Sequence, residues 1–157
     1  MQKVKQRTDD ELQRAVVHVN YEIDMFKALT SHFQKSQKGI PDDTLQNNAY
    51  VESFVLHLRN LIDFLYAPRN PKQPDDMRAD DFVKDAVEWN KVRPAKTPLL
   101  RDAEMRVDKL AAHLTYARVE LSKKWRYPDI YSDLSKVLQR FHDHLASHRQ
   151  GWFPSLK

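Results

Sequence analysis

The stretch from Thr97 to Lys124, TPLLRDAEMRVDKLAAHLTYARVELSKK, decides the fold because it has the most regular apolar spacing in the chain. Thr97 has the side chain of an N-cap, and Pro98 takes the first helical position, where a missing N–H costs nothing. Apolar residues follow at alternating spacings of three and four, namely Leu100, Ala103, Val107, Leu110, Leu114, Ala117 and Leu121. This spacing predicts one helix with a buried face of about six turns, ending around Trp125 to Tyr127, before Pro128.

Two long helices are predicted before this stretch. Thr8 and Glu11 have the spacing of a capping box, and helical periodicity continues to about Lys38, before the stop signals Gly39 and Pro41. Asp42, Asp43 or Thr44 can cap a second helix, which ends near Tyr66. The two pack most simply as an antiparallel hairpin.

Shorter elements fill the rest of the chain. Residues 67–79 form a long connection with three prolines, which is either a functional or a mobile loop. Asp80 starts a short helix with Phe82, Val83, Ala86 and Trp89 inward. Asp129 starts a last helix that runs to Gly151, and the tail 151–157 either folds back on the bundle or is loose. We therefore expect an all-α, up-and-down bundle of about five helices in a single domain, 1–157.

Composition excludes several classes of protein. The 157 residues include two glycines and no cysteine, so nucleotide-binding glycine loops, disulfides and thiolate chemistry are excluded. A net charge of +4 and a pI near 9.2 permit nucleic-acid binding without requiring it. No apolar run is long enough for a membrane span, and no signal core follows the N-terminal lysines. We expect a cytoplasmic protein with no membrane partner.

The first candidate for a catalytic site is a stripe of polar residues beside the apolar face of residues 97–124. It contains Asp102, Arg106, Lys109, His113, Tyr116 and Glu120. On a helix Arg106 and His113 would lie roughly 10 Å apart. A histidine can serve as general base or acid on a ribose hydroxyl, and an arginine can hold a phosphate. The alternative is that Arg106 pairs with Asp102 while His113 hydrogen-bonds a neighbouring helix.

A second candidate lies in the segment HLRNLIDFLY. Arg59 and Asp63 are four residues apart on one helix face, and Asn60 lies beside them. Asp63 could orient an imidazole such as His113, as in hydrolytic sites. In the alternative, Arg59 and Asp63 are a solvated pair worth a few tenths of a kcal/mol, roughly.

The segment RVDKLAAHLTYAR resembles the arginine-to-histidine motif of the HEPN superfamily of prokaryotic helical-bundle proteins, with Arg106 and His113 in its two places. The resemblance implies a homodimer with a shared cleft and, in active relatives, metal-independent RNA cleavage in toxin or antiviral systems. Under it, His113, Arg106, Arg59 and Asp63 would be catalytic, and Asn60, Tyr116 and Arg118 would bind substrate. Val107 follows the arginine where active members have a polar residue, so the chain could equally keep the bundle without the nuclease.

The remaining histidines and aromatic residues favour ordinary structural roles. His144 and His148 are four apart on a predicted helix, but no further ligand at metal spacing accompanies them, so we predict neither metal nor cofactor. His142 belongs to the same surface group, and His18, His32 and His57 are scattered along the helices. Four aromatic residues lie near basic ones, where they either stack nucleic-acid bases or pack in the core: Trp89, Trp125, Tyr127 and Tyr131.

Two functions follow. The first is a HEPN-like protein that binds RNA or cleaves it without metal. The second is a non-enzymatic, dimeric adaptor or antitoxin-like module, with a protein partner encoded by an adjacent gene, in which the same polar residues fix helix packing.

Overall fold

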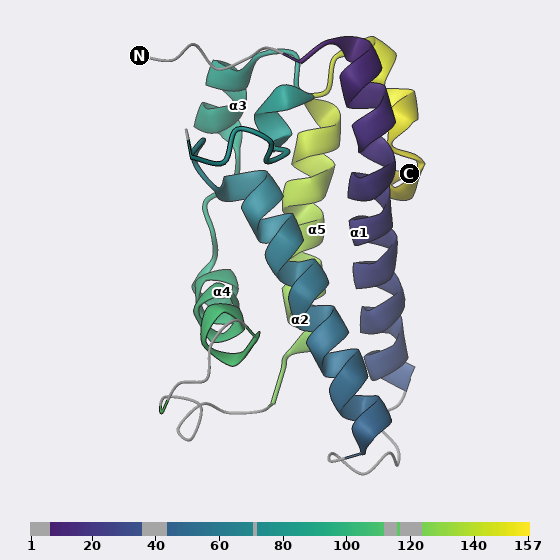
Figure 1. The fold of residues 1–157 in the computed structure, drawn as a ribbon, viewed down its shortest axis with the longest axis vertical. Helices are drawn as coiled ribbons and strands as arrows, with labels where there is room; N and C mark the ends of the chain where they lie inside the picture. Colours follow the sequence, from purple (N-terminus) through teal and green to yellow (C-terminus); the bar gives the residue numbers. More distant parts are fainter. Residues whose placement is uncertain (1–6, 36–43, 71, 112–115, 117–123) are drawn as a thin grey trace.

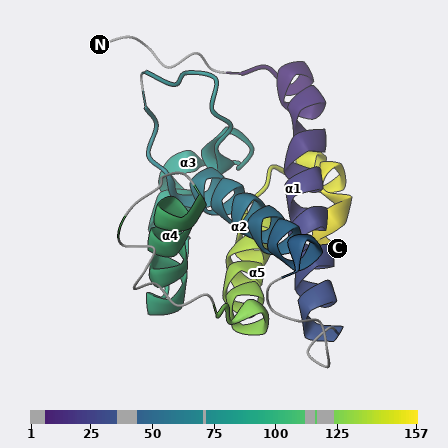
Figure 2. The same cartoon turned by 60° about the horizontal axis from the view of Figure 1, so that its bottom comes forward.

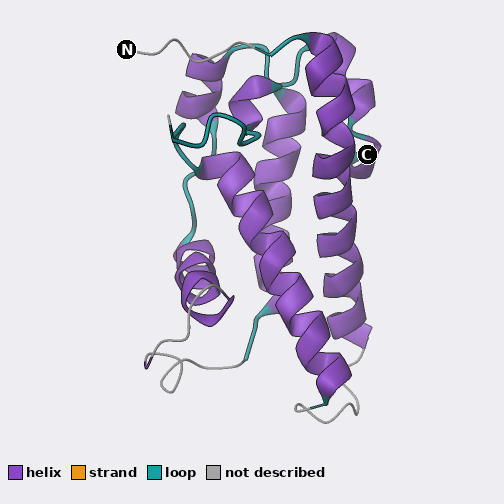
Figure 3. Ribbon diagram, viewed as in Figure 1, coloured by secondary structure: helices purple, strands orange, loops and turns teal. Residues whose placement is uncertain are grey.

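The structure is a computed structural model that describes residues 7–35, 44–70, 72–111, 116 and 124–157. Over this part the fold is an all-α helical bundle without strands, which confirms the predicted class (Figure 3). The α-helices are α1 (Asp9–Lys35), α2 (Leu45–Tyr66), α3 (Ala86–Val92), α4 (Pro98–Ala111) and α5 (Tyr127–Asp143). Short 3₁₀ helices add η1 (Ala79–Asp81), η3 (Ser147–Trp152) and η4 (Pro154–Leu156).

The first two helices begin where their caps predict. The backbone N–H of Thr8 donates to Glu11 Oε2 at 2.9 Å, and the N–H of Glu11 donates to Thr8 Oγ1 at 3.2 Å, which completes the capping box. Thr44 caps α2 by accepting from the Asn47 N–H at 3.1 Å. The alternative caps, Asp42 and Asp43, and the predicted stop at 38–41 lie outside the described residues.

Three long helices make the body of the bundle. In Figure 1, α1 and α5 run alongside each other and α2 crosses them obliquely. The other view shows α4 on the side of α2 and α5 away from α1, and α4 contacts both of them (Figure 2). The antiparallel hairpin of α1 and α2 is the most extensive of these contacts.

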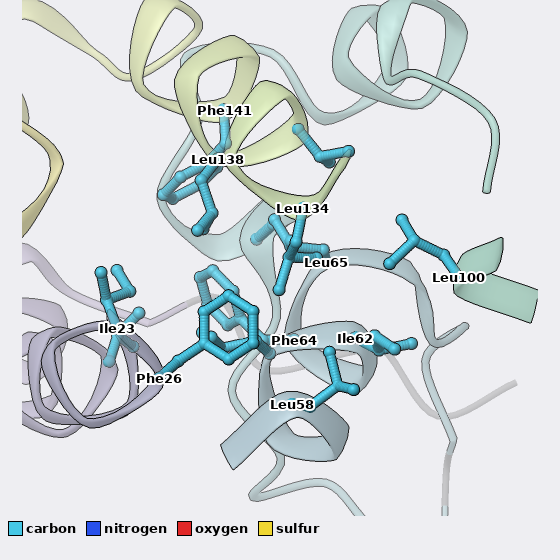
Figure 4. Packing of buried hydrophobic residues seen from close by; sticks show 14 of the residues in the cluster. Ile23, Phe26, Leu58, Ile62, Phe64, Leu65, Leu100, Leu134, Leu138 and Phe141 are labelled. Atoms are coloured by element: carbon cyan, nitrogen blue, oxygen red, sulfur yellow. The ribbon is translucent and has the colours of Figure 1, made fainter. Parts of the chain in front are cut away.

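The core lies where these helices meet. Figure 4 shows Ile23 and Phe26 from α1, Leu58 and Leu65 from α2, and Phe141 from α5 pointing toward one another. All five are at most 1% exposed. Removing one such ring or branched side chain would cost about 2–5 kcal/mol, so this core fixes the relative placement of α1, α2 and α5.

The long helix predicted across Thr97–Lys124 is only partly right. Thr97 Oγ1 caps α4 by accepting from the Leu100 N–H at 3.1 Å, and Leu100, Ala103 and Val107 are at most 1% exposed. Arg106 Nη2, however, donates to the backbone oxygen of Lys124 at 2.9 Å. Along one continuous helix these residues would be about 27 Å apart, so a single helix over the whole stretch is wrong.

The predicted short helix from Asp80 is also corrected. The chain makes the 3₁₀ turn η1, and α3 starts only at Ala86. Asp85 sets this start because its Oδ1 accepts from the N–H groups of Val87 and Glu88, at 2.8 and 2.9 Å. The inward positions remain as predicted for Trp89 at 0%, but Ala86 is only half-buried.

The C-terminal segment folds back against the bundle. The helix predicted to run from Asp129 to Gly151 begins two residues earlier, with Tyr127, and ends at Asp143. Phe153 is 0% exposed and packs on Phe141, with ring centroids 5.3 Å apart. Both views place the last turns beside α1 (Figures 1 and 2).

A polar cluster, which we name the C-terminal latch, ties this segment to the start of α1. It consists of Asp9, His148 and Arg149. Arg149 donates to Asp9 Oδ1 from Nη2 at 2.6 Å and from Nε at 3.0 Å. His148 Nε2 lies 3.0 Å from Asp9 Oδ2. The latch therefore joins the two ends of the described chain.

Candidate functional site

A concave site lies between the second half of α2 and the connection that follows it. We name it the loop pocket, and its volume is about 610 Å³. The described residues that line it are Arg59, Asn60, Asp63, Phe64, Ala67, Pro68, Arg69, Asn70, Gln73, Asp76, Met77 and Arg78. Its size is within the range of small-ligand sites.

Hydrogen bonds between near neighbours form a turn within this connection. Asn70 Oδ1 accepts from the Lys72 N–H at 3.0 Å, and the Asn70 backbone oxygen accepts from the Gln73 N–H at 2.9 Å. This arrangement is typical of an Asx turn, which needs no partner from elsewhere in the chain. The connection predicted as functional or mobile thus contains a turn with defined hydrogen bonds among its described residues 70, 72 and 73.

A buried arginine then anchors the end of the connection to α2. Arg78 is 7% exposed, and its Nη1 donates to the Asp63 backbone oxygen at 3.0 Å. Its Nη2 donates to Asp76 Oδ2 at 2.6 Å. The Asp63 backbone oxygen also accepts from the Ala67 N–H at 3.0 Å, so Arg78 adds a second donor, and a cation is favoured at the C-terminal end of a helix such as α2. Arg78 is therefore occupied in building the pocket.

Arg69 has a similar structural role. Its Nη2 donates to Asp81 Oδ1, and its Nε lies 3.6 Å from Asp80 Oδ2. The sequence did not reveal either role, because Asp80 lies 11 positions from Arg69 and the Asp63 carbonyl lies 15 positions from Arg78. An arginine at each side of a proline-rich connection was the only available signal.

The three polar residues predicted on α2 do come together in the loop pocket. Arg59 Nε lies 3.8 Å from Asp63 Oδ2, and Asn60 lines the same cavity. Arg59 Nη2 also lies 3.4 Å from Asp108 Oδ1, which brings α4 to the edge of the site. Both distances exceed those of strong charge-assisted hydrogen bonds. Arg59, 39% exposed, is therefore held loosely.

Burial, rather than pairing, dominates the electrostatics of Asp63. Desolvation raises the pKa of its carboxyl group, and the opposing attraction of Arg59 and Arg78 does not cancel this effect. The side chain is nevertheless 47% exposed. Asp63 is thus an accessible carboxylate that the described residues satisfy only incompletely.

The arginine of the predicted α4 motif is placed differently. Arg106 is 8% exposed, its guanidinium carbon lies 4.0 Å from the centroid of the Trp125 ring, and it donates to Lys124. Its predicted partner Asp102 is present at 3.8 Å. These contacts agree with the alternative in which Arg106 serves packing.

Two further residues predicted around that motif, His113 and Arg118, lie outside the described residues. The predicted contact between His113 and Asp63 therefore involves a residue that the structure does not describe. Tyr116 is described and is 98% exposed. Among the predicted site residues that the structure describes, Arg59, Asn60 and Asp63 lie together.

A pair formed by a buried histidine and a glutamate was not predicted from the sequence. His57, expected to be an ordinary helix residue, is 5% exposed, and its Nδ1 lies 2.6 Å from Glu22 Oε2. Glu22 and His18 line a smaller cavity of about 160 Å³, which shares Asn60 with the loop pocket. Only the antiparallel register of α1 and α2 brings Glu22 and His57 together, so no local motif could reveal the pair.

The remaining candidates have structural roles. His148 belongs to the latch, and His144 Nδ1 lies 2.8 Å from the Arg140 backbone oxygen. Among the residues that the structure describes, no group of three or more potential ligands could hold a metal ion.

Trp89 and Trp125 are at most 8% exposed, so neither offers a free face for stacking a base. Tyr127 stacks on Phe33, and Tyr131 on Phe26, with centroids 4.0 and 5.8 Å apart.

Comparisons with protein-family models, curated proteins and solved structures find no match for this chain. The resemblance to the HEPN superfamily therefore stays a prediction from the residues of the chain. The described helices include none that combines the length and the apolar character needed to cross a membrane.

Proposed function

We propose that the protein is a HEPN-like RNA-binding protein that holds a nucleotide of single-stranded RNA in the loop pocket. The observation that carries this proposal is the gathering of Arg59, Asn60 and Asp63 with Asn70 and Gln73 around one cavity of about 610 Å³. Arginine, amide and carboxylate side chains are those that read the hydrogen-bonding edges of bases. Unpaired RNA can turn a base out into such a pocket.

The charge pattern favours a base over a phosphate as the occupant. Three guanidinium groups and two carboxylates are among the described residues of the pocket lining. Arg69 and Arg78 are engaged by aspartates, which would repel a phosphate placed between them. Base edges offer donors as well as acceptors, so they match a lining of mixed charge.

Binding is tested with a fluorescently labelled single-stranded RNA and its polarisation at two salt concentrations. Arg59→Gln should weaken binding by about tenfold, because a charged contact to the nucleotide is lost. The matched control is Arg126→Gln, an exposed arginine at the start of α5 that also has an aspartate partner, Asp129, at 2.8 Å. Equal affinity of both variants and the parent would contradict the proposal.

Cleavage is the more specific form of this proposal. Under it, as the HEPN resemblance implies, His113 takes the proton of the ribose 2′-hydroxyl, whose oxygen attacks the adjacent phosphorus while the bond to the 5′-oxygen breaks and that oxygen takes up a proton. A second copy of the chain completes the cleft. Purified protein incubated with total RNA in a chelator should degrade it, and His113→Ala should abolish degradation. His144→Ala is the control, since that ring is bound to its own helix backbone. RNA left intact by the parent protein would exclude the nuclease while leaving RNA binding open to the polarisation assay.

The burial of Arg106 favours a second candidate, a non-enzymatic helical module. If this arginine serves only to hold residues 124 and 125 against α4, the motif keeps the bundle and has no active site. Arg106→Gln should then lower the melting temperature by several degrees, through a lost buried hydrogen bond. His113→Ala would remove no activity. The partner would be a second copy of the chain or the product of an adjacent gene, and sedimentation would detect the homodimer.

A further inference from the structure

We propose that Arg59 and Asp63 together select guanine as the base held in the loop pocket. This inference rests on the proposed RNA binding and adds the identity of the base. It starts from the spacing of the two residues, which are four apart on α2 and line the same cavity, with Arg59 Nε 3.8 Å from Asp63 Oδ2. Donors and acceptors therefore stand side by side on one wall of the pocket.

Both side chains are free enough to reach a ligand. Their exposed fractions are 39% for Arg59 and 47% for Asp63. The Arg78 side chain, by contrast, is buried and engaged with Asp76 at 2.6 Å. Arg59 and Asp63 thus form the looser ion pair of the described pocket lining and can select a ligand. The tighter pair, Arg78 with Asp76, holds the pocket together.

Guanine matches this order of donors and acceptors. Its O6 and N7 accept from arginine, and its N1–H and N2–H₂ are two adjacent donors that a carboxylate can accept together. Adenine has a single donor group on its pairing edge, next to an acceptor. Uracil has one N–H between two carbonyls, and cytosine has one amino group beside two acceptors. Each of these three would place an acceptor against the Asp63 carboxylate.

The environment of Asp63 adds to the preference. Burial disfavours its charged form, and among the described residues its arginine partner on α2, Arg59, lies 3.8 Å away, beyond a strong hydrogen bond. Two N–H groups of a bound guanine would supply strong donors, whereas a base with one donor would leave part of the carboxylate unsatisfied. One bidentate contact of this kind discriminates by about 5- to 150-fold.

The experiment compares labelled pentamers of sequence UUXUU, where X is guanine, inosine, adenine, cytosine or uracil. Inosine lacks the N2 amino group and keeps N1–H, O6 and N7, so it isolates one of the two donors. We expect guanine to bind at least about tenfold more tightly than adenine, with inosine between them. This comparison uses the parent protein alone and does not depend on how any variant folds.

A substitution then assigns the preference to its residue. Asp63→Asn should bring guanine to the affinity of adenine while binding of the uracil pentamer remains. Asp102→Asn is the matched control, because Asp102 is 51% exposed and lies four residues before Arg106, 3.8 Å from its guanidinium. It should keep the guanine preference.

The outcomes separate this inference from the proposed function. Equal, measurable binding of all five pentamers would overturn guanine selection and leave RNA binding standing. A guanine preference that survives Asp63→Asn would overturn the assignment to Asp63. Failure of every pentamer to bind would overturn both proposals.

Discussion

The C-terminal latch and the loop pocket each place an aspartate beside an arginine, with opposite results. Arg149 hydrogen-bonds Asp9 at 2.6 Å and chiefly through this bond lowers the pKa of that carboxyl group. Asp63 has Arg59 only at 3.8 Å, and burial raises its pKa. A charge satisfied by short hydrogen bonds serves stability. A charged group that lacks short hydrogen bonds inside a cavity is available to a ligand. The latch and the loop pocket differ in this respect.

The largest expected effect is on the aromatic core beneath the latch. Phe153→Ala should lower the free energy of unfolding by about 3–5 kcal/mol, because a fully buried ring leaves a cavity between Phe82 and Phe141. Denaturant titration measures this loss. Leu156→Ala, at a partly buried position in the same segment, is the control and should cost clearly less. A loss below about 1 kcal/mol for Phe153→Ala would mean that the segment adds little stability.

Arg149→Ala should have the next largest effect, on the order of 1.5–3 kcal/mol. Its side chain is 16% exposed and donates to Asp9 and to the backbone oxygens of Asp81 and Phe82, at 3.0 Å each for the latter two. The same denaturant titration applies. Arg126→Ala, at 69% exposure, should change stability by no more than about 0.5 kcal/mol. If the two substitutions cost the same, the latch is an ordinary surface ion pair.

The sequence predicted what depends on near neighbours. The capping box of Thr8, the cap of α2 by Thr44, one of three candidate residues, and the pairing of Arg59 with Asp63 each join residues at most four apart, so local spacing reveals them. Contacts between distant segments could not be predicted in this way. Arg149 reaches Asp9 across 140 positions, for example, and only the assembled bundle determines that contact.

The dependence on distant contacts also explains why the sequence predicted only part of the loop pocket. The sequence places Arg59, Asn60 and Asp63 on one face of α2, but the wall opposite them comes from the connection that Arg78 anchors. In α4, Arg106 has the spacing of a catalytic motif, yet Trp125 covers its guanidinium from beyond the end of the helix. Sequence spacing shows which residues share a helix face, but their burial in the folded protein determines whether they can contact a ligand.

Asp9→Asn tests the latch through its pH dependence. A lowered pKa in the folded state contributes stability above the ordinary pKa of aspartate, near 4, and this contribution disappears as the pH falls through the lower value. The variant should therefore melt at a lower temperature than the parent at pH 7, and the two melting curves should converge near pH 3 or below. A difference that is constant from pH 7 to pH 2 would show that the charge of Asp9 is not responsible.

Asp63→Asn should give the smallest effect, and with the opposite sign. A raised pKa means that folding favours the protonated carboxyl, so its contribution to stability is present below the ordinary pKa and is lost as the pH rises through the raised value. At pH 7 the ionised side chain is a cost, which the neutral amide removes; because the group is half exposed, we expect a melting temperature that rises by only about 1–2 °C. Thermal melts from pH 3 to pH 8 should show this gain at neutral pH and its disappearance in acid. A fall at pH 7 would make Asp63 a stabilising anchor like Asp9, and the loop pocket would then have no unsatisfied carboxylate to offer a ligand.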